Sequence, residues 1–119
     1  MAVRLAALMG FLGVALGAFG AHGLKDLLAR HETLETWKTA VLYHLIHAVM
    51  LFILARQKPV PSFAWLSFFG GILVFSGSLY LLAITNLKWL GAITPLGGVA
   101  FLAGWVCLML SAGGSRNEG

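Results

Sequence analysis

The sequence has very few charged residues. They make up 10% of its 119 residues, against about a quarter in an average soluble domain, whereas hydrophobic residues make up 60%. A soluble chain of this length could not bury so much apolar surface inside itself. The shortage of charge therefore excludes an ordinary soluble domain and predicts that the chain lies in a membrane.

Acidic residues and cysteine are scarcer still. The four Asp and Glu residues fall outside the long apolar segments, so no carboxylate pair for acid–base catalysis lies within a membrane helix. The single cysteine, Cys107, excludes an internal disulfide. The eight basic residues are scattered without forming a stripe, so we expect no nucleic-acid partner and only a modest attraction to membrane lipids.

Four long stretches carry no charge at all. They separate Arg4 from Lys25, Lys38 from Arg56, Lys58 from Lys88 and Lys88 from Arg116. Crossing the hydrocarbon core takes about 20 apolar residues. We therefore predict an all-α integral membrane protein with one domain, a bundle of four transmembrane helices at residues 4–21, 36–55, 62–84 and 90–112.

Four crossings would place both termini on one side of the membrane, here called side A, together with the loop 56–61. Side B then carries the loops 22–38 and 85–89. Each side has four basic residues, so the positive-inside rule gives no orientation, and only the N-terminal amine and the RQK cluster favour side A as cytoplasmic. We expect a multi-pass protein of the cell inner (plasma) membrane. Its first apolar run resembles a signal peptide, but we expect it to be retained as a helix.

The loop on side B after the first helix is expected to contain a short interfacial helix. Leucines alternate with charged residues at helical spacing over residues 24–32, which is typical of an amphipathic helix lying on the membrane surface. Thr33 is expected to cap the next helix, and Trp37 and Lys38 to anchor it at the interface.

Glycines recur along single faces of three predicted helices. Small residues let helix backbones approach closely in lipid, so we interpret these positions as packing contacts rather than ligand contacts. They are Gly10, Gly13, Gly17 and Gly20 in the first helix, Gly70 and Gly77 in the third, and Gly97 and Gly104 in the fourth.

Polar side chains at membrane depth gather toward side B. They are His22, Tyr43, His44, His47, Ser76, Ser78, Tyr80 and Thr94. Such groups are costly in lipid and should face protein or a water-filled cavity. We expect them to cluster as candidates for a ligand pocket, although a closed hydrogen-bonded plug is the alternative. For Ser76 and Ser78, bonds back to the carbonyls of Ile72 and Val74 would be the simplest outcome.

The Thr94-Pro95 pair predicts a break at the start of the fourth helix. Threonine suits the cap and proline the first helical position, so residues 91–93 would be irregular backbone. The alternative is one helix from residue 88 that is kinked at Pro95.

Three blocks of the sequence resemble a known family. They are LGAFGAHGL, TAVLYHLIHAV and FSGSLYLLAITNLKWLGAITPLGGVAFLAGW. Together they are similar to the small bacterial inner-membrane family that includes YgdD and YwdK, called domain of unknown function 423 and related to the eukaryotic transmembrane protein 256. The resemblance implies four membrane helices and no established activity. At His44 the family often has glutamine.

Three classes of function fit these residues. The first is a protein, expected not to be an enzyme, that binds or transports a small molecule or lipid through a polar pocket and forms a homo-oligomer. The second is a structural or assembly subunit with a membrane-protein partner. The third, ranked last, binds a metal or haem through histidines, because His44 and His47 share a helix face but form no metal motif of recognised spacing. We expect no cofactor.

Overall fold

The computed structural model of the chain is built from helices. It describes residues 1–118, and it describes side chains as far as Ser111. The elements in chain order are α1 (Ala2–Ala21), α2 (Lys25–His31), α3 (Leu34–Ala55), α4 (Ser62–Gly71), the π-helical turn η1 (Ile72–Ser76), α5 (Gly77–Thr85), the 3-10 helix η2 (Lys88–Ala92) and α6 (Thr94–Glu118).

Four helical stretches are long and apolar enough to cross a membrane. They are Ala2–Ala21, Leu34–Ala55, Ser62–Thr85 and Lys88–Ser111. The third span joins α4, η1 and α5 into one rod, and the fourth begins in η2 and continues in α6. The predicted fold class, four membrane helices with a short helix between the first two, is confirmed.

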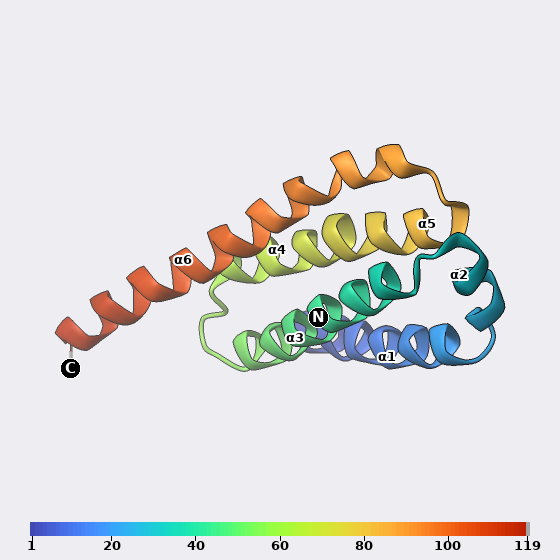
Figure 1. The fold of residues 1–119 in the computed structure, drawn as a ribbon. Coiled ribbons are helices and arrows are strands. Elements are labelled where there is room, and N and C mark those ends of the chain that lie inside the picture. Colours follow the sequence, from blue (N-terminus) through green and yellow to red (C-terminus); the bar gives the residue numbers. More distant parts are fainter. Residues whose placement is uncertain (119) are drawn as a thin grey trace.

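The spans lie side by side in a row (Figure 1). The helix α3 has α1 on one side and the third span on the other, and α6 packs against the third span. The helices α1 and α6 form the two edges, and no extended contact joins them within residues 1–118. Because α3 lies inside the row, it is the element from which side chains reach both neighbours.

Three glycines bring α1 close to α3. A Cβ added at Gly13 would lie 2.5 Å from a methyl group of Leu45, and one at Gly20 would overlap the indole of Trp37. One at Gly17 would lie 3.3 Å from Val41. Any larger side chain here would separate the two helices, as expected for a small-residue face in lipid.

A second close contact joins the third span to α6. A Cβ at Gly104 would lie 2.5 Å from the ring of Phe68, and one at Gly97 would overlap the backbone nitrogen of Phe75. Gly71 plays the same part against Phe101 and was not among the predicted packing residues.

Three of the predicted packing glycines leave open space beside them. A Cβ at Gly10, Gly70 or Gly77 would meet no atom within 4 Å. A larger side chain would fit there within this chain, so their role as packing residues stays a prediction.

The helix α2 lies where the interfacial helix was expected, and its Leu28 is fully buried. Thr33 is the N-cap residue of α3, as expected, but its side chain does not bond to the first turn; the hydroxyl donates to the Ala83 carbonyl oxygen at 2.9 Å. Trp37 is not an interfacial anchor, since it is 2% exposed and donates its indole N–H to the Leu16 carbonyl oxygen at 2.8 Å. In both cases a tertiary hydrogen bond replaces the local role.

The fourth span is broken before α6, as the Thr94-Pro95 pair predicts, and α6 begins at Thr94 with Pro95 in its first turn. The expectation of irregular backbone at residues 91–93 is wrong for Gly91 and Ala92, because both belong to the 3-10 helix η2 and only Ile93 lies between the two helices. The single helix kinked at Pro95 is therefore wrong, because the backbone changes helix type before the proline rather than at it.

Candidate functional site

The two histidines of α3 form hydrogen bonds with different neighbouring helices. His44 is 3% exposed, and its Nε2 lies 2.8 Å from the carbonyl oxygen of Met9 in α1. A carbonyl can only accept, so Nε2 carries the proton and donates it. The other nitrogen, Nδ1, is then an acceptor, and it lies 2.8 Å from the Tyr80 hydroxyl of α5, which donates. His44 thus joins three spans through one neutral ring.

His47 has the opposite tautomer. Its Nδ1 lies 2.8 Å from the Tyr43 carbonyl oxygen and donates to it, so Nε2 is the acceptor. The indole N–H of Trp105 in α6 donates to that Nε2 at 3.0 Å. The imidazole also stacks on Phe101, with ring centroids 3.7 Å apart and planes within 9°. His47 therefore bridges α3 to α6 across a layer of aromatic rings.

These bonds decide what the histidines can offer a ligand. Both nitrogens of both rings are engaged, so a metal ion would have to displace a hydrogen bond to reach either one. Within the described part of the chain, no group of three or more His, Cys, Asp or Glu side chains is placed to hold a metal. The geometry suits hydrogen-bonding struts better than ligation.

Ser76 and Ser78 of the third span also form hydrogen bonds with neighbouring helices. Ser76 donates to the Ala40 carbonyl oxygen of α3 at 2.8 Å. Ser78 lies 2.6 Å from the hydroxyl of Thr94 in α6 and donates to the Phe75 carbonyl oxygen at 3.0 Å. The expected bonds back to Ile72 and Val74 are wrong, because the π-turn at residues 72–76 changes the local register and other acceptors lie closer.

The predicted polar residues do not form one group. They pair instead within separate contacts, and every buried side-chain nitrogen or oxygen in the described residues has a partner. His22 stands apart: it follows the last residue of α1 and its side chain is exposed. The arrangement resembles the closed plug more than an open polar pocket.

One hollow nevertheless reaches two of the candidates. It lies between α3, η1 and α6 and has a volume of about 460 Å³. Its lining is Tyr43, His47, Phe75, Pro95, Gly98, Val99, Phe101, Leu102 and Trp105. Tyr43 is 40% exposed, and its hydroxyl makes no hydrogen bond to the described residues, in contrast with Tyr80.

Sequence reasoning missed the partners of the polar residues. Trp105 and Trp37 supply indole N–H donors to His47 and to α1, but Trp37 was expected to be an interfacial anchor and Trp105 was given no role. The only signal was that tryptophan at membrane depth needs an acceptor for its N–H. Which acceptor it finds depends on the helix order, which the sequence alone did not give.

The four spans, with hydrogen bonds between helices inside a mainly apolar core, define a multi-pass membrane protein. A sequence profile described as "Protein of unknown function (DUF423)" matches residues 16–98. The chain belongs to this family. The UPF0382 membrane protein YwdK of Bacillus subtilis is 45% identical over 117 residues, covering 92% of this chain and 94% of that protein.

Other relatives are equally well covered. UPF0382 membrane proteins of Staphylococcus epidermidis and Staphylococcus haemolyticus are each 43% identical over 114 residues, with 92% of both chains covered. No solved structure matches the chain. The relatives' names confirm the membrane location and the resemblance seen in the sequence, and they describe no activity.

Proposed function

We propose that this protein binds a membrane-dissolved small molecule in the hollow between α3 and α6. The observation that carries the proposal is the Tyr43 hydroxyl, which lines the hollow without a hydrogen-bond partner in the described residues. Tyr43 lies nine residues into α3, roughly 13 Å from its start, where water is scarce. An unpartnered hydroxyl at that depth is costly, and a polar group on a ligand would relieve the cost.

The chemistry of the lining favours a particular class of ligand. Five aromatic or imidazole rings and Pro95 surround the hollow, so the body of the ligand should be apolar and flat. One hydrogen-bonding atom, such as a carbonyl oxygen, would meet Tyr43. The volume of about 460 Å³ falls within the range of roughly 300–1,000 Å³ that small-molecule sites occupy.

Binding is proposed rather than transport or catalysis. The other polar side chains at membrane depth are consumed by hydrogen bonds between helices, so they offer no polar path across the membrane. The ligand should therefore enter and leave sideways from the lipid.

The test compares molecules that copurify with purified variants. Gly98→Leu should fill the hollow, since a Cβ at Gly98 meets only ring atoms of Phe75 at 3.8 Å or beyond, in ordinary contact. Tyr43→Phe removes only the hydroxyl.

Mass spectrometry of organic extracts should show a compound bound to the wild type, reduced in Tyr43→Phe and absent in Gly98→Leu. Gly70→Leu, at an open position outside the hollow, is the matched control and should keep it. Identical extracts from all four proteins would refute the proposal.

A second candidate is an assembly subunit or homo-oligomer. The observation in its favour is that a Cβ added at Gly10, Gly70 or Gly77 would meet no atom of the described residues within 4 Å, and a small residue with open space beside it suits close approach of another helix. The same samples, measured intact in mild detergent, report the stoichiometry. Gly70→Leu should reduce a native oligomer to monomer if this face carries the contact.

We also propose the plasma membrane as the location, with both termini in the cytoplasm. The support is the cluster of Arg56 and Lys58 in the loop that lies on the same side as the N-terminus.

A further inference from the structure

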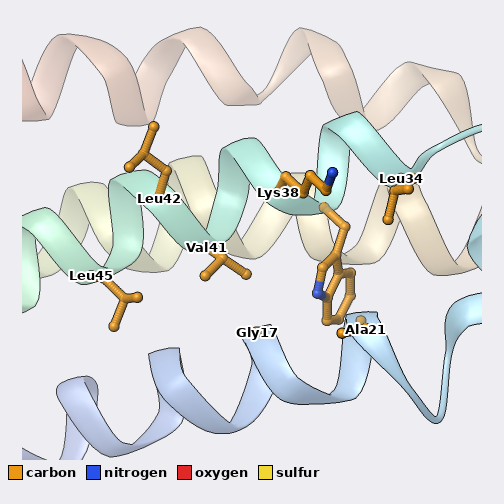
Figure 2. A pocket seen from close by; sticks show the side chains of 9 residues that line it. Gly17, Ala21, Leu34, Lys38, Val41, Leu42 and Leu45 are labelled. Carbon is orange, nitrogen blue, oxygen red and sulfur yellow. The ribbon is translucent and has the colours of Figure 1, made fainter.

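A second concavity lies on the opposite side of α3. It is a groove between α1 and the first half of α3, with a volume of about 320 Å³ (Figure 2). Its lining is Gly17, Gly20, Ala21, Leu34, Trp37, Lys38, Val41, Leu42 and Leu45. The groove exists because α1 presents only small side chains where α3 presents large ones.

The wall of the groove is rigid. The indole of Trp37 in α3 donates its N–H to the Leu16 carbonyl oxygen of α1 at 2.8 Å. The ring also packs against Tyr80, with centroids 4.8 Å apart. With its N–H already satisfied, Trp37 presents to the groove only an apolar surface.

The length of the groove matches one leaflet of a bilayer. From Leu34 to Leu45 the helix rises roughly 16 Å, about half of a hydrocarbon core of about 30 Å. Leu34 is the first residue of α3 and so marks the side B surface. The groove therefore runs from the membrane surface to its middle, as an acyl chain does.

The single charge of the lining lies at the surface end. Lys38 has an exposed side chain, and its ammonium pairs only with Glu35, one turn away, at 3.5 Å. That pair is exposed on both sides and contributes little, so the ammonium can turn to another anion. A lysine near a helix end extends its charge to the headgroup layer while its stem lies along apolar surface.

We infer that the groove binds one anionic phospholipid of the side B leaflet, with an acyl chain along Trp37 and Val41 and the phosphate at Lys38. This site is separate from the hollow that contains Tyr43 and does not depend on the function proposed there. A second copy of the chain is the competing occupant, and the experiment distinguishes the two.

The experiment measures lipid retention by native mass spectrometry. Wild-type protein in mild detergent is mixed with phosphatidylglycerol or phosphatidylcholine, and the lipid-bound fraction is read at each concentration. Because one lysine near an anionic surface is worth about fivefold in affinity, Lys38→Gln should weaken phosphatidylglycerol binding about fivefold and leave phosphatidylcholine unchanged. Lys88→Gln removes an exposed charge at the other edge of the row and should bind as the wild type does.

A second variant tests the groove itself. Ala21→Leu should fill the surface end and reduce retention of both lipids, whereas Ala7→Leu, on an exposed position of the same helix, should change neither. One phosphatidylglycerol per chain, with binding weakened in Lys38→Gln and Ala21→Leu alone, supports the inference. Equal binding by Lys38→Gln and Lys88→Gln would overturn it, and so would a dimer that Ala21→Leu converts to monomer.

Discussion

At the residue scale, the polar side chains of the spans act as fixed struts. His44 and His47 each donate through one nitrogen and accept through the other, and each bridges α3 to different neighbours. A neutral imidazole is well suited to this, because it places a donor and an acceptor on one rigid ring. The same two bonds can be made by the amide of glutamine, which also has a donor and an acceptor.

The first prediction concerns His44. Replacing it by leucine leaves the Tyr80 hydroxyl without a partner and removes the second hydrogen bond to the Met9 carbonyl, which keeps its bond within α1, so stability in detergent should fall by about 1–3 kcal/mol. His44→Gln should lose much less, since the amide can donate to the carbonyl and accept from the hydroxyl. Thermal unfolding of the purified variants measures the difference.

Tyr80→Phe provides the control. In the wild-type background it should destabilise, because His44 loses its donor. In the His44→Leu background it should cost little or even restore stability, since the orphaned hydroxyl is removed. Additive effects of the two changes would show that the bond between His44 and Tyr80 contributes nothing.

At the element scale, helices meet where a glycine removes the Cβ. The contacts differ in what opposes the glycine: a side chain at Gly13 and Gly104, but the backbone of η1 at Gly97. A side chain can move aside, whereas a backbone held in a helix cannot. Gly97 is therefore the position at which the spacing of α6 and the third span is most strictly set.

The second prediction follows from this difference. Gly97→Ala should lower the melting temperature, because the new Cβ would collide with the Phe75 backbone. Gly77→Ala should leave it unchanged or raise it, since the position is open and alanine favours a helix over glycine by about 1 kcal/mol. If both variants melt together, the close contact between α6 and η1 is not as described.

Much at this scale was predictable from the sequence. The gaps between charged residues predict four spans, and the Thr94-Pro95 pair predicts the break before α6, because both depend on local chemistry. The packing glycines could not be separated from the open ones, since Gly10 and Gly13 look alike until the neighbours of α1 are known. For the same reason the tertiary acceptors of Thr33 and Trp37 were not predictable: each side chain bonds to a helix distant in sequence.

At the scale of the whole molecule, the row of spans has one concavity on each side of α3. The hollow beside α6 carries Tyr43 and His47, and the groove beside α1 carries Lys38. Because α3 is inside the row, its two faces serve different neighbours. The site was thus only partly predictable: Tyr43 and His47 line one concavity, but His22 lines neither.

The third prediction concerns the path of the chain through the membrane. The loop 56–61 joins the second and third spans on side A, whereas Asn86 ends α5 on side B. The helix α2 also lies on side B, because Thr33, which follows it, bonds to Ala83 near the end of α5. The test uses single cysteines in a Cys107→Ser background. A cysteine at Gln57 should lie on side A, and cysteines at Lys25 and Asn86 should lie on side B. A membrane-impermeant thiol reagent applied to intact cells should label Lys25→Cys and Asn86→Cys, and should reach Gln57→Cys only after lysis.

Labelling of Gln57→Cys alone would keep the fold and reverse the proposed orientation. Labelling of Lys25→Cys and Asn86→Cys from opposite sides would contradict the bond between Thr33 and Ala83 and with it the arrangement of the row.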